Sequence, residues 1–260
     1  MPDSFSFDRA ADFYDSTRDL PEPVATRGIQ AILDVVGPGA RILDVGTGTG
    51  RISVPLLKRG ADLVGCDLSA KMMARLQVKF PAARLAQADA SRLPFPVNYF
   101  DAVTTCHVMH LVGPWREALH EYRRVLKTGG VYVNARTEQE GESVHEQVRD
   151  FWKERVDALG FVSQRPGVRD DKDMQEELRG MGAELKQVEV VRFTRSHSVR
   201  EEIDRLGSRK FSHTWDIPQD VFAQGLRDLR AWAGREYADL DAPHAVTEAF
   251  ILDIARFRKN

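Results

Sequence analysis

The chain has few cysteines, no excess of charge of either sign and no long apolar run. Cys66 and Cys106 are the only cysteines among 260 residues, which excludes a disulfide framework and a zinc site with the usual ligand spacing. A net charge of -2 offers no basic field for nucleic acid. No apolar run approaches the roughly 20 residues that span a bilayer, and no signal-type segment begins the chain. We expect a cytoplasmic protein that binds neither metal nor nucleic acid and does not insert into membranes.

Short β-type runs alternate with runs of helical period from about residue 22 to 138, which is typical of successive βαβ units and a parallel sheet. The expected strands are residues 41–46, 62–68, 83–89, 99–108 and 129–136. The expected helices between them are residues 51–60, 69–80 and 114–130. Ser69 should cap the second helix, Gly129 and Gly130 should end the third, and Pro55 bends the first unless that helix begins late.

The pattern changes after residue 138. Residues 138–161 have helical period, and we expect the apolar stripe with Phe151 and Trp152 to form the core of a lid. Two late strands, 184–198 and 245–258, suggest a hairpin at one edge of the sheet, with helices in 198–209 and 218–238. We predict a single domain over 1–260. Its core comprises residues 22–138, 183–198 and 244–260, and its lid comprises residues 1–21, 139–182 and 199–243.

The stretch RILDVGTGTGR, residues 41–51, joins a strand to a helix through three glycines at alternate positions. Glycine tolerates positive φ and lets the backbone approach a ligand closely. The dinucleotide fingerprint G-x-G-x-x-G would need its third glycine at residue 51, where this chain has Arg51. The loop therefore predicts a nucleotide-type ligand without identifying it.

Three aspartates lie at or near the ends of the first three expected strands. Asp44 precedes the glycines, Asp67 ends the second strand where a carboxylate can accept both ribose hydroxyls, and Asp89 ends the third, where it can accept from an adenine amine. The alternative is that each aspartate only ends its strand as a turn former. Together with the glycines, the row favours a bound adenine nucleoside.

Four stretches in this region resemble the ordered motifs of class I S-adenosylmethionine-dependent methyltransferases of the small-molecule type. They are ILDVGTGTGR, GCDLSAKMM, ADASRLPFPVNYFDAVTTCHVMHLV and WREALHEYRRVLKTGGVYV, and the resemblance covers about residues 40–136. It implies an α/β fold with a Rossmann-like seven-stranded sheet of order 3-2-1-4-5-7-6, the last strand being antiparallel. It also implies S-adenosyl-L-methionine as the cofactor.

The resemblance also implies roles for individual residues. Those lining the methionine part of the cofactor would be Gly46, Thr47, Gly48 and Gly50, with Asp44 near its amino group through water and Cys106 where the family places a backbone carbonyl. Those around the nucleoside would be Asp67 at the ribose, Leu68 and Met72 on the adenine, and Asp89 and Ala90 at its edge. The stretch FYDSTRD resembles the family's Tyr-Asp-x-x-Arg, so Tyr14 and Arg18 would close over the cofactor's carboxylate; a solvated Arg18 is the alternative.

The implied reaction is an in-line displacement of methyl from sulfur, for which a base is needed only with a hydroxyl or amine acceptor. His107 and His110 follow the fourth strand. We expect His107 to act as a base or to position the acceptor and His110 to contact the substrate, the alternative being a structural role for each. Residues 209–218 resemble the family's lid, so we expect Arg209, Ser212, His213 and Trp215 to line the acceptor site, unless Phe211 and Trp215 only pack.

We therefore predict an enzyme that methylates a small molecule at an atom the sequence leaves open, as a monomer or homodimer. Two alternatives remain. The first is a nicotinamide-dependent oxidoreductase, which Arg51 and Asp89 disfavour. The second is a non-catalytic protein that binds S-adenosylmethionine.

Overall fold

The computed structural model describes residues 4–17, 20–141, 143–162 and 166–258. The chain divides into two compact units. The first comprises Met1–Thr137, Arg165–Val191 and Phe250–Asn260, and the second comprises Glu138–Gln164 and Arg192–Ala249. Across the described ranges, no helix combines the length and the apolar character needed to cross a bilayer.

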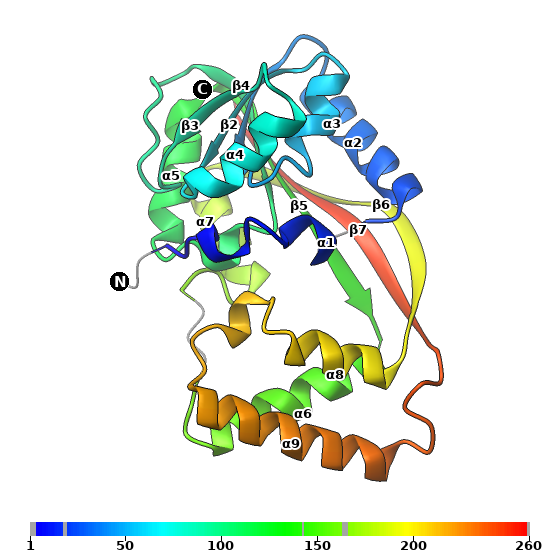
Figure 1. The fold of residues 1–260 in the computed structure, drawn as a ribbon. Helices are drawn as coiled ribbons and strands as arrows, with labels where there is room; N and C mark the ends of the chain where they lie inside the picture. Colours follow the sequence, from blue (N-terminus) through cyan, green and yellow to red (C-terminus); the bar gives the residue numbers. More distant parts are fainter. Residues whose placement is uncertain (1–3, 18–19, 142, 163–165, 259–260) are drawn as a thin grey trace. The chain divides into compact units, whose positions relative to one another are not determined.

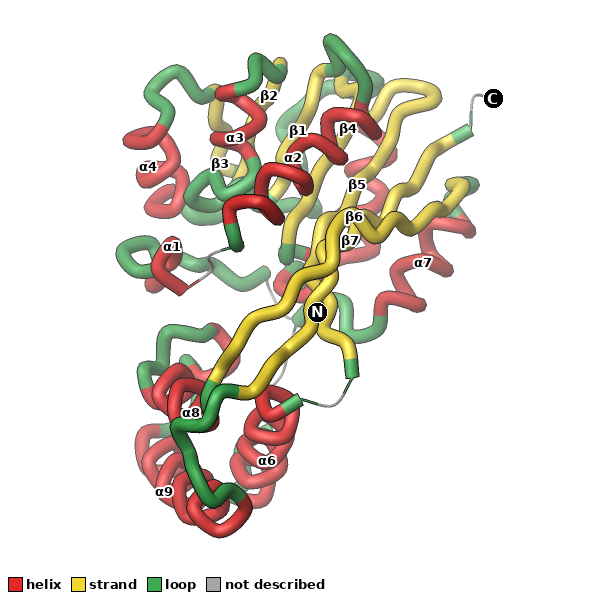
Figure 2. Tube along the Cα trace, turned by 90° about the vertical axis from the view of Figure 1, so that its right-hand side faces the viewer, coloured by secondary structure: helices red, strands yellow, loops and turns green. Residues whose placement is uncertain are grey.

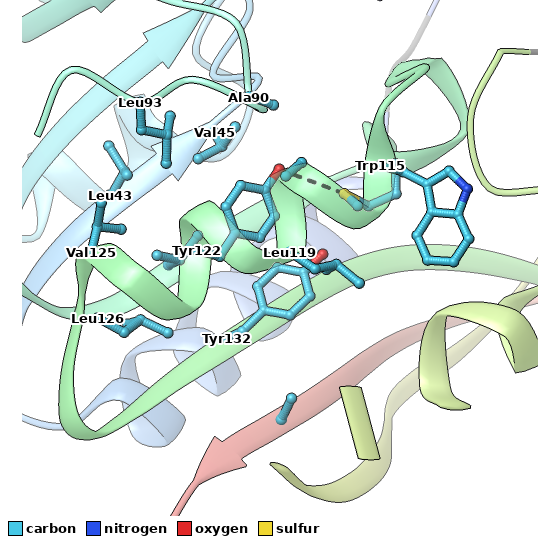
Figure 3. Close-up of a cluster of buried hydrophobic side chains, with 14 of the residues drawn as sticks. Leu43, Val45, Ala90, Leu93, Trp115, Leu119, Tyr122, Val125, Leu126 and Tyr132 are labelled. Atoms are coloured by element: carbon cyan, nitrogen blue, oxygen red, sulfur yellow. Dashed lines mark hydrogen bonds between the residues drawn. The ribbon is translucent and has the colours of Figure 1, made fainter. Parts of the chain in front are cut away.

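One seven-stranded sheet runs in the order β3-β2-β1-β4-β5-β7-β6, which confirms the predicted order (Figure 1). Its strands are β1 (Arg41–Val45), β2 (Asp62–Asp67), β3 (Arg84–Gln87), β4 (Phe100–Cys106), β5 (Leu126–Glu140), β6 (Ala183–His197) and β7 (His244–Phe257). Strands β1 to β5 pair in parallel. The chain runs along β7 opposite to β5, so the sheet is mixed (Figures 1 and 3).

Strand β1 lies at the centre of the parallel part, between β2 and β4. Its side chains from Ile42 to Val45 are all buried, as expected for a strand covered on both faces. The order reverses at β1, because the chain builds outward through β2 and β3 and then returns to β4. The carboxyl ends of the strands at such a switch point are where open α/β sheets bind ligands.

In the first unit, η1 (Asp8–Ala10) and α1 (Tyr14–Thr17) precede α2 (Glu22–Val36), α3 (Ser53–Lys58), α4 (Ala70–Lys79), η2 (Met109–Leu111), α5 (Trp115–Val125) and α7 (Asp171–Gly180). Figure 3 shows α5 pressing Leu119 and Tyr122 against the sheet beside Leu43. The Tyr122 hydroxyl, buried there, donates to the Met109 sulfur at 3.6 Å. This apolar layer fixes η2 behind the carboxyl end of β4.

Two of the predicted helix boundaries are confirmed and one is wrong. Ser69 caps α4, where its hydroxyl accepts from the Met72 amide. Helix α3 begins late, so Pro55 lies in its first turn, where no amide donor is needed. Helix α5, however, ends at Val125, and Gly129 and Gly130 lie within β5. A Cβ on Gly130 would approach the Lys127 carbonyl oxygen to 2.8 Å, so the backbone near the start of β5 leaves room only for glycine at this position.

The second unit contains α6 (Val144–Ala158), α8 (Val199–Gly207), η3 (Ser212–Thr214) and α9 (Gln219–Glu236) (Figure 2). The predicted stripe on α6 contributes Val148, Trp152 and Val156 to an apolar cluster shared with α8 and α9. Phe151 stacks on Trp232 with ring centroids 4.5 Å apart. These side chains form the core of the second unit.

Glu202 on α8 is a charged side chain buried in the second unit, only 3% exposed. His145 Nδ1 lies 2.7 Å from its Oε2, and Arg205 Nη1 donates to its Oε1 at 2.8 Å. Burial opposes ionisation of Glu202, but the His145 hydrogen bond and the Arg205 charge outweigh it and lower the pKa of this carboxyl below its usual value. The contact between His145 and Glu202 ties α6 to α8.

We predict that Glu202→Gln loses about 1–3 kcal/mol of unfolding free energy at pH 7, as expected when a buried charged partner is removed. Because the folded pKa is lowered, the stabilisation is present above the unfolded value of 4.5 and is lost as pH falls through the folded value. Urea unfolding from pH 7 to pH 3 should show the wild type and variant converging. Exposed Asp204→Asn is the matched control, and a difference that persists undiminished to pH 3 would contradict the assignment.

Candidate functional site

The loop after β1 has a backbone that requires glycine. Gly46, Gly48 and Gly50 have φ of 70°, 54° and 87°. A Cβ on Gly46 would lie 2.3 Å from Val108 Cγ2, and one on Gly50 would lie 2.5 Å from Val54 Cγ2. The Gly46 and Thr47 amides donate to the Cys66 carbonyl at 2.8 and 3.0 Å. The loop is therefore pressed between the end of β4, α3 and β2.

The buried side chain of Asp44, in β1, holds this loop in place. Its carboxylate is 3% exposed, accepts from the Thr104 hydroxyl at 2.8 Å and accepts from the Ser53 hydroxyl. Ser53 in turn contacts the Thr47 hydroxyl. Burial raises the pKa of Asp44 despite these hydrogen bonds. Asp44 thus joins β1 to β4 and to the start of α3, and its role toward a cofactor amino group stays a prediction.

Asp67, at the end of β2, holds the other side of the loop. The Gly48 amide donates to its Oδ2 and the Ser69 amide donates to its Oδ1, each at 2.8 Å. Burial raises the pKa of Asp67, while these backbone hydrogen bonds act in the opposite direction. Leu68 is half-buried and Met72 is buried, with its Cε 3.4 Å from where a Gly48 Cβ would lie. Gly48, Asp67 and Met72 are therefore neighbours.

Asp89 follows β3 rather than ending it, because that strand stops at Gln87. Its Oδ1 accepts from the Ser91 amide at 2.8 Å and from the Ser91 hydroxyl at 2.7 Å, which shapes a turn, and the neighbouring Ala90 is buried. Asp44 near the end of β1, Asp67 at the end of β2 and Asp89 just after β3 thus lie at the carboxyl ends of three adjacent strands. Their contacts with a nucleoside stay predictions.

Acidic residues of the N-terminal segment, to which the sequence analysis assigned no role, contact the same region. Asp8 accepts from the Ser69 hydroxyl at 2.5 Å, and Asp15 accepts from the Thr49 hydroxyl at 2.6 Å. Asp15 also pairs with Lys79 at 2.6 Å, and Asp12 pairs with Arg75. The three aspartates are spaced four and three residues apart, and the two cations Arg75 and Lys79 lie four residues apart on α4. This matching spacing was the signal in the sequence that could have indicated the contacts.

Tyr14, one of the two predicted cofactor contacts in this segment, lies in α1 with its ring edge-on to Phe7 at 5.9 Å. The other, Arg18, falls outside the described residues. Phe5 connects the segment to η2, just after β4, since its amide donates to the Leu111 carbonyl at 3.0 Å. Residues 5–15 therefore extend from the end of β4 to the glycine loop and α4.

The carboxyl end of β4 carries three of the predicted residues. Arg51 Nη2 lies 3.1 Å from the Cys106 sulfur, which connects the loop to this strand. His107 has a φ of 55°, and its Nε2 accepts from the Thr137 amide at 3.3 Å. His110 lies in η2, where its carbonyl accepts from the Gly167 amide. The structure thus brings Cys106 and His107 next to the glycine loop.

The remaining four predicted residues belong to the second unit. Arg209 is committed to its own loop: its guanidinium donates to the carbonyls of Thr214, Trp215 and Ile217 and lies over the Phe222 ring. The Trp215 indole donates back to the Arg209 carbonyl at 3.0 Å, and Trp215 is buried. These contacts fit the packing alternative. Ser212 and His213 lie in η3, and a role of any of the four toward an acceptor stays a prediction.

Comparison with known proteins matches residues 43–134 to a family model described as a methyltransferase domain. A demethylmenaquinone methyltransferase of Beutenbergia cavernae is 39% identical over 132 residues, covering 50% of this chain and 55% of that protein. A ubiquinone/menaquinone biosynthesis C-methyltransferase UbiE of Cereibacter sphaeroides is 37% identical over 135 residues, covering 48% and 54%. The chain spans about half the length of these curated relatives.

Solved structures share the fold over most of the chain. The YcgJ protein of Bacillus subtilis matches with a TM-score of 0.60 and 16% identity, covering 90% of this chain and 100% of that one. A protein of Thermotoga maritima, described as an S-adenosylmethionine-dependent methyltransferase and possible histamine N-methyltransferase, matches with a TM-score of 0.55 and 18% identity, covering 98% of each chain. At these identities the likeness shows the fold.

We predict that Gly46→Ala destabilises the chain more than Gly60→Ala. Both residues have positive φ, but a Cβ on Gly60 meets nothing within 4 Å, whereas one on Gly46 overlaps Val108. The shared backbone strain costs about 1–2 kcal/mol, and the overlap should add about 1–3 kcal/mol. Urea unfolding measures both losses. Val108→Ala should partly rescue Gly46→Ala, and equal losses in the two single variants would contradict the packing argument.

Proposed function

We propose that this chain, whose residues 43–134 match a methyltransferase domain, is a class I S-adenosylmethionine-dependent methyltransferase that transfers a methyl group to a small organic acceptor. The observation that carries the proposal is the convergence of the glycine loop with Asp67 at a topological switch point. The loop brings bare backbone to the ends of β1 and β4, and the carboxylate next to it is already oriented by two amides. Such a site suits a nucleoside with an extended polar tail.

The described residues fit S-adenosylmethionine. Asp67 receives one amide on each oxygen, and since each carboxylate oxygen has two lone pairs, both can still accept a ribose hydroxyl. Leu68 and Met72 would pack on the adenine, and Asp89 and Ala90 would meet its edge. The residues for the methionine part would be Tyr14, Gly46, Thr47, Gly48, Gly50 and Cys106.

Chemistry in this site needs little covalent help from the protein. When bound, S-adenosylmethionine supplies a methyl group on a positively charged sulfur, which leaves as a neutral thioether. The chain's own contribution is to align the acceptor with that methyl group and to exclude water, effects that reach about 7–11 kcal/mol in well-oriented systems. The rigid loop, fixed by Asp44 and by positive φ, supports this alignment.

A quinone-type ring is the acceptor class that the comparisons favour. The two curated relatives named above carry menaquinone and ubiquinone methylation in their names. Their similarity covers half of their length, so the acceptor class is an extension of the proposal. The family match also favours methyl transfer over the nicotinamide alternative.

Calorimetric titration tests the cofactor. We expect S-adenosylmethionine and S-adenosylhomocysteine to bind and NAD not to bind. Asp67→Asn should weaken binding about 10–100-fold, because an amide nitrogen would face one of the two backbone donors, and each tenfold loss corresponds to about 1.4 kcal/mol. Asp34→Asn, on the exposed side of α2, is the control and should bind normally. Binding of NAD alone would overturn the proposal.

Turnover separates an enzyme from a protein that only binds the cofactor. We expect the chain to form S-adenosylhomocysteine and a product heavier by one methylene when supplied with S-adenosylmethionine and a panel of reduced quinones, phenols and carboxylic acids. Mass spectrometry of both products measures it, with the Asp67→Asn chain as the matched control. Tight cofactor binding without turnover on any of these acceptors would favour the non-catalytic alternative.

A further inference from the structure

The tip of the glycine loop, residues 48–50, carries a single side chain. Gly48 and Gly50 have positive φ and no side chain that could pack against the rest of the fold. Thr49 lies between them and is only 1% exposed. Thr49 is therefore the residue through which side-chain contacts from outside the loop can hold its tip.

Two charged side chains contact Thr49. Its hydroxyl donates to Asp15 Oδ1 at 2.6 Å, and Lys79 Nζ donates to its carbonyl oxygen at 2.8 Å. Lys79 Nζ also lies 2.6 Å from Asp15 Oδ2. The three residues thus form a closed set of contacts in which both oxygens of Asp15 are engaged. The set joins the N-terminal segment, the loop tip and the last turn of α4.

The Asp15 carboxylate is ionised at neutral pH. Burial opposes ionisation, but the hydrogen bonds from Lys79 and Thr49 outweigh it and lower the pKa of Asp15 below its usual value. The Thr49 hydroxyl therefore donates to a charged acceptor, which makes this hydrogen bond stronger than one between neutral groups. A buried hydroxyl that lost such an acceptor would be left unsatisfied.

We propose that Asp15 is a positioning residue for the cofactor, which holds the loop tip through Thr49 in the shape that binds the methionine part of S-adenosylmethionine. This deepens the proposed function and rests on it. The neighbouring Gly48 amide donates to Asp67 Oδ2 at 2.8 Å. Two adjacent residues of the tip are thus held by two carboxylates, one from β2 and one from the N-terminal segment.

Asp12 provides an internal comparison for Asp15. It belongs to the same segment, carries the same charge and pairs with Arg75, one turn before Lys79 on α4. Its side chain is 82% exposed, however, and this pair is made to the helix rather than to the loop. If an ion pair to α4 were all that mattered, Asp12 and Asp15 would be equivalent. If Asp15 acts through Thr49, only Asp15 affects the cofactor.

Calorimetric titration of the full chain with S-adenosylhomocysteine tests the proposal. We expect Asp15→Ala and Thr49→Val each to weaken binding about tenfold, because each removes the same hydrogen bond to a charged group. The double variant should then bind about as well as either single variant, since residues in one contact are not additive. Thr49→Ser keeps the hydroxyl and should recover most of the affinity that Thr49→Val loses.

Asp12→Ala is the matched control and should change binding less than about twofold, as expected for an exposed ion pair. An equal loss in Asp12→Ala, or losses that multiply in the double variant of Asp15 and Thr49, would overturn the proposal. Urea unfolding checks that each variant is folded at the titration temperature. Should Asp15→Ala not fold, Asp15→Asn replaces it: it keeps an oxygen for the Thr49 hydroxyl, and we expect a loss between those of Asp12→Ala and Thr49→Val.

The same titration separates this proposal from the function on which it rests. A wild-type chain that does not bind S-adenosylhomocysteine would reject the proposed function and the positioning role together. A wild-type chain that binds it, with Asp15→Ala folded and equally tight, would reject the positioning role alone.

Discussion

The buried carboxylate of Asp44 is the constraint on which the site depends. A carboxylate taken out of water is costly unless donors surround it, and here hydroxyls of Ser53 and Thr104 supply them. Those hydroxyls come from the start of α3 and from β4, so hydrogen bonding to one buried carboxyl group joins three elements around the end of β1. The glycine loop between them then has one path, which explains its positive φ at three residues. The contacts within the chain therefore set the shape of the glycine loop.

The parallel half of the sheet was predictable because its strands are continuous apolar runs and its turns carry local signals. Ser69 illustrates such a signal, since a cap involves only neighbouring residues. Gly129 and Gly130 illustrate its limit. Two glycines after a helical pattern usually end a helix, but here the chain leaves α5 at Val125 and uses Gly130 where β5 passes close to the Lys127 carbonyl. The conformational preferences of neighbouring residues do not predict that contact.

The same distinction separates the site residues that the sequence predicted from those it missed. Gly48 and Asp67 stand out because strand ends and glycine loops are local patterns. The hydrogen-bond partners of Asp8 and Asp15, Ser69 and Thr49, lie 61 and 34 residues away, so no local motif identifies them. Arg209 has a different kind of contact. Three carbonyls of its own loop accept hydrogen bonds from its guanidinium, which the sequence did not predict, and its role toward an acceptor stays a prediction.

The two sides of the site are held by interactions of different strength. The glycine loop rests on a buried carboxylate and tight packing, which salt hardly screens. The N-terminal segment is held by Asp12, with 82% of its side chain exposed, and Asp15, with 54% exposed, and such surface pairs contribute about 0–1 kcal/mol each. The segment also has side-chain hydrogen bonds to the region of the loop, from the Ser69 hydroxyl to Asp8 and from the Thr49 hydroxyl to Asp15. It thus combines exposed ion pairs with a few specific hydrogen bonds, whereas the loop rests on buried contacts. That residues 1–21 belong to a lid stays a prediction.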